Sequence, residues 1–275
     1  MLKWYFYLGL ALIILAQINF ILIIRPFAYW YIPIVWWGFI LVVDSLVYKI
    51  AGKSMIATYP KEFLFLVLLS VPFWTIFEVY NIFTHSWYYV HYFWYVHIVD
   101  FMIIMPAFME TFTLFTVLGV GKKLDMKGIS NTRKKGNERS HLNVIRLLVV
   151  LGLIASVLPI LLPKLGYLFE WTGLFLLIDP INYLTGRPSI IRMVSSGKAG
   201  IIARLALGGL VTGFFMEFWN YQAYPKWFYA FSANIRLFEM PLQGYVGYVP
   251  FMMEVFLFFA LFRSFIFKKE NAFLK

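Results

Sequence analysis

The sequence predicts an all-α fold, namely a polytopic membrane protein with eight transmembrane helices in two parallel four-helix repeats. Composition is the first reason: 62% of the 275 residues are hydrophobic, only 13% are charged, and the mean hydropathy is +0.77. These values lie outside the range of soluble globular domains. The apolar residues also fall into long runs, and motifs in the first half of the chain recur in the same order in the second half.

The apolar runs have the length that a bilayer requires. A helix crosses the hydrocarbon core with about 20 residues, so runs of roughly 17 to 25 residues are candidates. The candidate runs are 4–24, 29–48, 62–84, 98–120, 144–162, 166–185, 201–221 and 246–267. The first run is too long for a signal peptide and no small-residue cleavage site follows it, so we expect a retained helix.

Basic residues concentrate on one side of these helices. Eight crossings place both termini on the same side, together with the gaps after the second, fourth and sixth helices. All but four of the 24 basic residues belong to that side, and the exceptions are Arg25, Lys164, Lys226 and Arg236. The positive-inside rule therefore predicts cytoplasmic termini in a multi-pass protein of the cell (plasma) membrane. Because the basic residues follow the gaps, the net charge of +11 does not indicate nucleic-acid binding.

One polar stretch, 121–143, divides the chain. It is rich in Lys, Arg, Gly and Asn and is predicted to be a basic cytoplasmic linker, with contact to anionic lipid headgroups as an additional role. The first four-helix repeat is then 1–120, and the second is 144–275 with a basic C-terminal tail. Four helices is an even number, so the second repeat enters the membrane in the same direction and is related to the first by an axis along the membrane normal.

The order of the recurring motifs indicates a duplication. The matching pairs are Trp36-x-Gly38-x5-Asp44 with Trp171-x-Gly173-x5-Asp179, Ser54-Met55-Ile56 with Ser189-Ile190-Ile191, Glu78-x-x-Asn81 with Glu217-x-x-Asn220, Trp87-Tyr88-Tyr89 with Trp227-Phe228-Tyr229, and Pro106-x3-Glu110 with Pro250-x3-Glu254. Asp44 and Asp179 lie near basic residues at helix ends, so we expect them to form salt bridges.

Carboxylates inside the apolar runs are the leading candidates for a site. An ionised group costs about 2.5 kcal/mol or more within the membrane on insertion scales, so matched ones suggest a function. A spacing of three places each glutamate and its asparagine on one helix face. Four glutamates are expected to converge in the outer half of the bilayer, unless they only join helices. The candidate catalytic residues are Glu217, Glu254, Asn220, Glu78, Glu110 and Asn81.

The second repeat is predicted to hold the working pair, Glu217 and Glu254, with Asn220 orienting one of them. Its outer segment has an extra acid and two glycines, which are features of a loop that lines a pocket. A buried glutamate without a cationic partner suits a general acid. Aromatic residues beside these acids form an interfacial belt or bind substrate. The candidate substrate-binding residues are Trp219, Tyr224, Trp227, Tyr229, Glu239, Tyr245, Tyr248 and Trp87.

Metal and cofactor sites are not predicted. The chain has no cysteine, which excludes thiolate catalysis and Cys-ligated metals. His85, His91 and His97 are six residues apart, which matches no zinc motif, so they are interpreted as interfacial polar side chains. The triplet at 52–54 lacks the earlier glycine of a phosphate-binding loop.

The second outer segment resembles the small integral-membrane carotenoid enzymes, namely the heterodimeric or fused lycopene cyclases and the carotenoid hydratases. The residues concerned are Glu217…Trp219-Asn220…Tyr224-Pro225-x-Trp227-x-Tyr229…Glu239-Met240-Pro241-Leu242…Pro250-x3-Glu254. The resemblance covers about forty residues in each half, and the family's Pro-x-Glu-Glu motif is stretched here to Pro-x3-Glu. It implies that Glu110 and Glu254 hold the family's acidic positions and that a polyene is protonated to a carbocation.

The sequence therefore favours an integral-membrane enzyme that uses glutamates as acid and base on a lipid-soluble, isoprenoid or carotenoid-like substrate. The expected reaction is a cyclisation, a hydration or an isomerisation, so the enzyme class is that of an isomerase or a lyase. A proton-coupled transporter of small solutes and a structural or assembly protein are the alternatives. The expected partners are the lipid bilayer and the lipid or isoprenoid substrate, without nucleic acid or a cofactor. The sequence does not define the oligomeric state.

Overall fold

The computed structural model describes residues 1–125, 138–230 and 235–268 and is mostly helical, at 77%. Its described part contains seven helices long and apolar enough to cross a membrane. They are α1 (Tyr5–Leu22), α2 (Tyr31–Ala51), α4 (Pro60–Thr84), α5 (Trp94–Val117), α6 (Glu138–Leu161), α10 (Gly200–Gln222) and α11 (Tyr248–Ile266). Each overlaps a predicted apolar run, so the membrane class is confirmed.

The predicted span at 166–185 is not one long helix. The chain forms α7 (Pro163–Gly166), a 3₁₀ turn η4 (Tyr167–Phe169) and the 12-residue helix α8 (Gly173–Leu184). Gly173 lies against the backbone of α6, where a Cβ atom would be 2.9 Å from the Cα of Ser156. A helix of 12 residues is about 18 Å long, less than the roughly 30 Å of the hydrocarbon core, so α8 alone does not cross it.

The predicted linker and tail lie partly outside the described residues, which exclude 126–137 and 269–275. Of the linker, the structure describes a short 3₁₀ helix, η2 (Lys122–Leu124), and the beginning of α6. That helix begins at Glu138, six residues before the predicted run at 144, because the polar residues that precede the run continue the same helix. The remaining 3₁₀ helices are η1 (Phe27–Trp30) and η5 (Leu242–Gly247).

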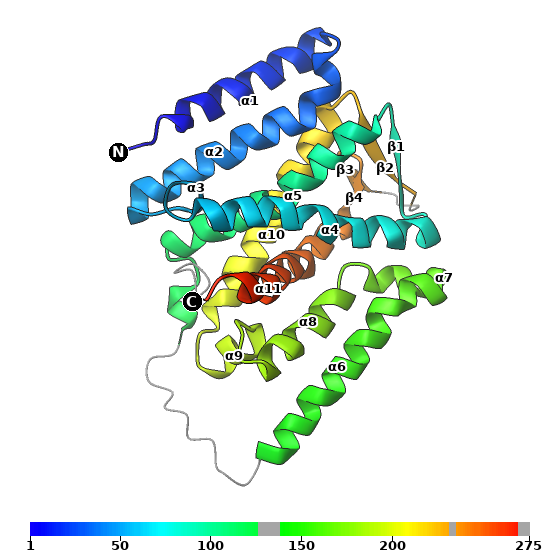
Figure 1. Cartoon of the computed structure of the whole chain (residues 1–275). Helices are drawn as coiled ribbons and strands as arrows, with labels where there is room; N and C mark the ends of the chain where they lie inside the picture. The colour runs from blue at the N-terminus through cyan, green and yellow to red at the C-terminus, as the bar shows by residue number, and fades with distance from the viewer. Residues whose placement is uncertain (126–137, 231–234, 269–275) are drawn as a thin grey trace.

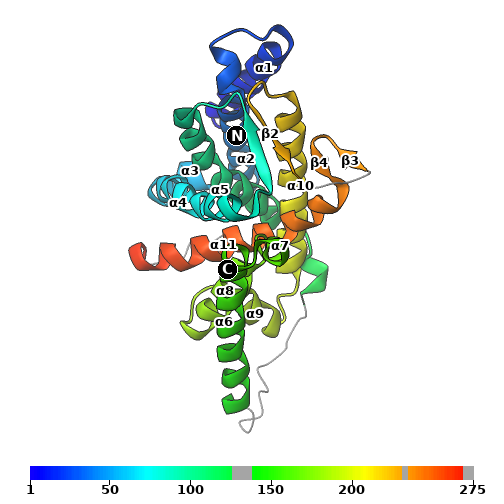
Figure 2. The same cartoon turned by 90° about the vertical axis from the view of Figure 1, so that its right-hand side faces the viewer.

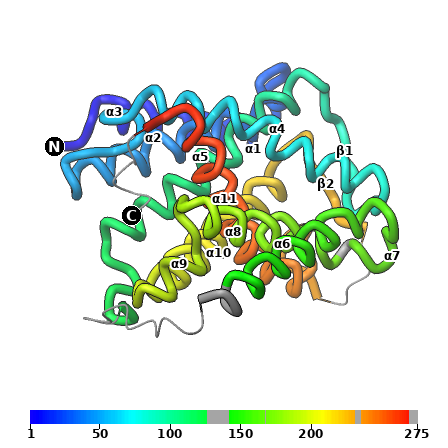
Figure 3. The backbone as a smooth tube through the Cα atoms, turned by 60° about the horizontal axis from the view of Figure 1, so that its bottom comes forward, coloured from blue at the N-terminus to red at the C-terminus, as the bar shows by residue number. Residues whose placement is uncertain are grey.

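The long helices run between two ends of the molecule (Figures 1 and 3). The described chain termini lie at one end with the short helices α3 (Met55–Thr58) and α9 (Ile190–Ser195), and we call this the terminal end. The opposite end holds α7 and a two-stranded antiparallel ribbon of β1 (Trp87–Val90) and β2 (Lys226–Tyr229), and we call it the ribbon end. A second short pair is β3 (Arg236–Leu237) with β4 (Met240–Pro241).

The ribbon was not predicted, and it joins the two halves of the chain. Its register pairs Trp87 with Tyr229 and Tyr89 with Trp227. Side chains alternate along a strand, so these four residues lie on one face of the ribbon. Four-residue aromatic segments are too short to show this alternation in the sequence, and they resemble an interfacial belt.

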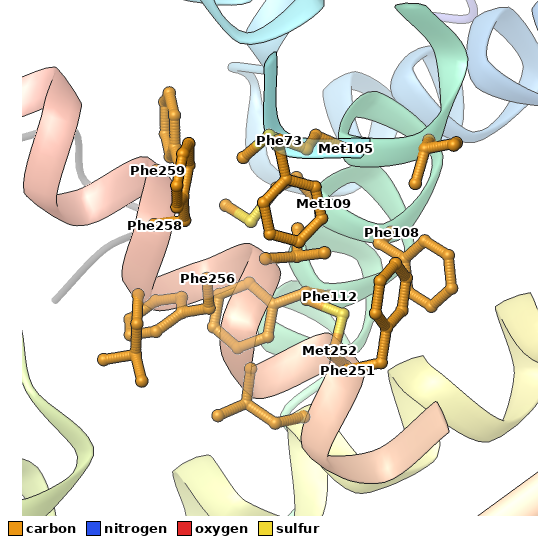
Figure 4. Close-up of a cluster of buried hydrophobic side chains, with 14 of the residues drawn as sticks. Phe73, Met105, Phe108, Met109, Phe112, Phe251, Met252, Phe256, Phe258 and Phe259 are labelled. Atoms are coloured by element: carbon orange, nitrogen blue, oxygen red, sulfur yellow. The ribbon is translucent and has the colours of Figure 1, made fainter. Parts of the chain in front are cut away.

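The centre of the molecule is formed by α4, α5, α10 and α11. On one side α2 packs on α5 and α1 lies outside α2, and on the other side α8 packs on α11 and α6 lies outside α8 (Figure 2). Phenylalanine and methionine side chains fill the space between α4, α5 and α11 (Figure 4). The labelled core residues are Phe73, Met105, Phe108, Met109, Phe112, Phe251, Met252, Phe256, Phe258 and Phe259. These side chains form the hydrophobic core that holds the three helices together.

Asp44 and Asp179 occupy matching places at the terminal end. Asp44 accepts hydrogen bonds from the Tyr5 hydroxyl (2.5 Å), the Ser54 hydroxyl (2.8 Å) and the backbone N–H of Ile56 at the start of α3 (2.8 Å). Asp179 accepts two from the start of α9, at 2.7 and 3.1 Å. The expected salt bridges were wrong: within the described residues neither aspartate forms one. The free N–H groups of a helix start satisfy a buried carboxylate without burying a cation.

Two ion pairs tie the halves together at the terminal end. At the start of α4, Glu62 accepts two hydrogen bonds from Arg263 at the end of α11, at 2.6 and 2.8 Å. At the start of α10, Arg204 lies 4.0 Å from Asp125, which follows α5. The same helix positions are thus joined in both halves, with the signs of the charges exchanged.

Candidate functional site

A cavity lies at the ribbon end, between the central helices and one face of the ribbon. Its volume, measured as the space that the centre of a water molecule can occupy, is about 60 Å³. Most of its wall is aromatic: Trp36, Trp74, Trp87, Trp171, Trp227, Tyr89, Tyr92, Tyr229, Tyr248, Phe101 and Phe251. Such a wall fits a slender apolar molecule, and its rings also stabilise positive charge. We call this the aromatic cavity.

The first half contributes a hydrogen-bonded chain that ends at this cavity. The Asn81 amide accepts from the Trp87 N–H and donates to the Trp87 carbonyl, each at 3.0 Å. The Trp87 indole donates to the Tyr89 hydroxyl at 3.1 Å, and that hydroxyl donates to Glu78. The Trp74 indole donates to the same carboxylate oxygen at 2.8 Å. Asn81 therefore fixes the strand, and Glu78 fixes the tyrosine.

The second half repeats this chain. Asn220 brackets the N–H and the carbonyl of Trp227, each at 2.9 Å. The Trp227 indole donates to Tyr229 at 2.9 Å, and the Tyr229 hydroxyl donates to Glu217 at 2.6 Å. The second donor to Glu217 differs, because it is the hydroxyl of Tyr248 on α11, at 2.5 Å.

The two tyrosines are held as neutral donors. Burial, followed by the negative charge of the neighbouring glutamate, raises the pKa of Tyr89 and of Tyr229 well above the usual value. Each hydroxyl accepts from a tryptophan and donates to a glutamate, so its hydrogen is already engaged. Glu78 and Glu217 thus act through their tyrosines and position the aromatic wall.

Two titratable side chains of α5, Asp100 and His97, line the cavity. Neither carboxylate oxygen of Asp100 has a hydrogen-bond partner among the described residues, and neither does Nε2 of His97. Asp100 is only 9% exposed. The His97 ring packs against Tyr89 and Tyr92, with centroids 4.1 and 4.3 Å apart. A spacing of three places the imidazole and the carboxyl group on the same face of the helix.

Asp100 was missed by the sequence reasoning, and His97 was assigned to the interface. The signal was present, since Asp100 lies in the predicted apolar run 98–120, where an acid suggests function. Asp100 has no matching acid in the second half, whereas the candidate acids were those that match between the two halves. Of the other cavity-lining tryptophans, Trp36 and Trp171 were identified as matching motif residues but not as site residues. Trp74 was not singled out, because a single tryptophan within an apolar run resembles a core residue.

Glu110 and Glu254 lie away from the aromatic cavity. The fully buried Glu254 accepts the backbone N–H of Phe175 near the start of α8, at 3.2 Å. Glu110 lies beside Asp44 on the way to the terminal end, and neither of its oxygens has a hydrogen-bond partner among the described residues. The structure therefore brings Glu78 and Glu217 to one site and separates Glu110 and Glu254 from it.

The predicted substrate-binding residues divide into two groups. Trp87, Trp227, Tyr229 and Tyr248 line the aromatic cavity. The others lie elsewhere: Trp219 packs edge-on against Trp36 at 4.7 Å, Tyr224 lines a second cavity, Glu239 pairs with Lys226 at 3.3 Å, and Tyr245 donates to the Leu237 carbonyl at 3.1 Å. In the described ranges, no group of three or more His, Asp or Glu side chains is placed to hold a metal ion.

Comparison with known proteins gives no relative. No family model, curated protein or solved structure matches this chain.

Proposed function

We propose that this chain is an integral-membrane enzyme that transfers protons to and from an apolar, isoprenoid-type substrate held in the aromatic cavity. The observation that supports this most is the pair Asp100 and His97 in a mostly aromatic wall, where both carboxylate oxygens and the imidazole Nε2 have no hydrogen-bond partner among the described residues. Titratable groups in a mostly apolar pocket are a common mark of an active site.

In this proposal the two unpartnered groups have different roles. A carboxyl group buried without a partner is more stable in its neutral form, so Asp100 is the proton donor. Transfer of its proton to a substrate double bond forms a C–H bond and leaves a carbocation, which the tryptophan and tyrosine faces stabilise. His97 accepts a proton from the adjacent carbon, and the double bond re-forms in a new position. Addition of water to the cation is the hydration alternative.

The proposal includes the arrangement of the chain in the membrane. We take α7 and α8 together as an eighth crossing and the halves as two parallel repeats. The matched hydrogen bonds of Asn81 and Asn220 support this, as do those of Asp44 and Asp179. Most of the described basic residues lie toward the terminal end, which supports cytoplasmic termini.

The experiment combines lipid identification with matched variants. Lipids that co-purify with the wild type and with Asp100→Asn and His97→Gln are identified by mass spectrometry, with His85→Gln as a control, because His85 lines neither cavity. We expect Asp100→Asn to retain the fold and an apolar lipid and to accumulate the unreacted form. If no lipid is enriched over the bulk membrane, or if the lipid profile of Asp100→Asn equals that of the wild type, the proposal is wrong.

A proton-coupled transporter is the second candidate, and one observation favours it. Glu110 is a second buried carboxyl group on α5 without a hydrogen-bond partner in the described residues, ten residues beyond Asp100 and so about 15 Å along the helix. Carboxyl groups at two depths suit stepwise proton movement. Solute-dependent proton uptake into proteoliposomes, lost in Glu110→Gln, would favour this function over the enzyme.

A further inference from the structure

A second cavity lies on the opposite face of the ribbon. Alternation along the strands directs Val90, Lys226 and Phe228 into it, while their neighbours Tyr89 and Trp227 line the aromatic cavity. Its other walls come from the ends of α1 and α10 and the start of α2. The volume open to the centre of a water molecule is about 400 Å³, larger than in the aromatic cavity. We call it the rim cavity.

Basic side chains lie in and beside the rim cavity. Lys226 and His91 line it, and none of its described lining residues is acidic. Arg25 lies next to it, since its guanidinium donates to the hydroxyl of the lining residue Tyr224 at 2.8 Å. Lys226 shares its charge with Glu239, at 3.3 Å, whereas Arg25 forms no ion pair within the described residues. Arg25 and Lys226 are also two of the four basic residues predicted on this side of the membrane.

A buried amide in the wall requires an acceptor. The side-chain oxygen of Asn19 accepts the backbone N–H of Ile24 at 3.0 Å, which fixes the amide orientation. Its Nδ2 is buried and has no partner among the described residues, although Asn19 is only 7% exposed. An unsatisfied buried donor is costly, so a ligand oxygen here would be stabilising.

The mouth of the rim cavity is apolar. Phe20 and Ile23 line it and are 40% and 53% exposed on α1, a helix whose outer surface is almost entirely apolar. In a membrane this surface faces acyl chains. The cavity therefore offers cationic and amide donors next to an apolar entrance, which matches an amphiphile.

We infer that the rim cavity binds the phosphate headgroup of an anionic phospholipid, with Arg25 and Asn19 donating to its oxygens and an acyl chain lying over Phe20 and Ile23. A guanidinium group matches the geometry and charge of a phosphate. The inference does not depend on the proposed function, because the two cavities lie on opposite faces of the ribbon.

Binding is measured by native mass spectrometry of the detergent-purified full chain, titrated with phosphatidylglycerol or phosphatidylcholine. We expect phosphatidylglycerol to bind more tightly, and Arg25→Gln to weaken it about tenfold, as loss of a charged hydrogen bond implies. Lys164→Gln removes a basic residue at the same end, on α7, and should leave binding unchanged.

Further variants separate the ligand contact from a structural effect. Arg25→Lys keeps the charge and should bind more tightly than Arg25→Gln. Tyr224→Phe removes the hydrogen bond that holds Arg25 but keeps the cation, and should weaken lipid binding less than Arg25→Gln does. Equal binding of the two lipids, or undiminished binding by Arg25→Gln, would overturn the inference. So would inorganic phosphate alone raising thermal stability as much as phosphatidylglycerol does, since the ligand would then be a free anion.

Discussion

The two halves of this molecule build the same hydrogen-bonded chain and then use it differently. In each half an asparagine brackets a tryptophan, the indole donates to a tyrosine, and the tyrosine donates to a buried glutamate. In the first half the second donor to the glutamate, Trp74, comes from the same helix. In the second half it is Tyr248, from the following helix.

The following helix is where the halves diverge. In the first half that helix is α5, which presents His97 and Asp100 to the aromatic cavity. In the second half it is α11, which presents Tyr248 and Phe251. The matched residues therefore form a frame, and the unmatched residues of α5 supply the titratable groups. That the second half holds the working pair stays a prediction, while the unpartnered groups that line the cavity come from the first half.

The largest expected difference between the halves concerns their ion pairs. Arg263→Met leaves Glu62 buried without its cation, and such a loss costs about 3 to 5 kcal/mol. Arg204→Met should cost about 1 kcal/mol, because the pair is 4.0 Å long and the Asp125 side chain is 32% exposed. Unfolding of both variants in the same detergent measures the difference. Equal costs would show that the Arg204–Asp125 contact is stronger than its geometry indicates.

The asparagines test whether the two frames are equally rigid. Asn220→Leu removes both hydrogen bonds from Trp227 and should cost about 3 kcal/mol, since Asn220 is fully buried. Asn81→Leu should cost about 2 kcal/mol, because its half-buried site admits replacement partners. Thermal unfolding measures both, and the Asn→Asp variants are the controls for shape. If Asn81→Leu destabilises the protein more than Asn220→Leu does, the hydrogen-bonded chain of the first half is the more rigid one and the prediction is wrong.

The second donors give a smaller effect. Tyr248→Phe removes one of the two hydroxyl groups that donate to Glu217 and should cost about 2 kcal/mol. Trp74→Phe removes the corresponding donor to Glu78 and should cost about 1 to 2 kcal/mol. The unfolding free energy of each single variant and of the double variant is the measurement. Strong non-additivity would mean that the two frames are coupled through the cavity.

The smallest effect is expected at Glu254. A glutamine retains the size of the side chain and the acceptor for the N–H of Phe175, so Glu254→Gln should change the free energy of unfolding by no more than about 0.5 kcal/mol. Glu254→Leu leaves that N–H without an acceptor and should cost more. Comparison of the two unfolding curves measures the difference, and equal destabilisation would show that the carboxylate charge is what matters there.

The long helices could be predicted because the length and the apolar composition of each run are visible in the sequence alone. The matching motifs of the two halves could be recognised because they keep their order. The site could be predicted only in part: Glu78 and Glu217 were found because both halves contain them. Asp100 was missed because a comparison of the two halves selects residues that both halves contain. The unpartnered groups of the cavity, Asp100 and His97, are present in the first half alone. The break before α8 depends on how closely Gly173 approaches α6. This is a contact between two helices, so the residues of one apolar run do not predict it.

The pairing of β1 with β2 has a consequence for assembly. The strands are separated by about half of the chain, so this contact has a high contact order and forms only after both halves are inserted. Until then β1 presents unpaired backbone groups at the membrane surface. A β2 strand from a second chain would satisfy them equally well, so two chains that insert together are open to exchange of halves, a domain swap that would rebuild each aromatic cavity from two polypeptides.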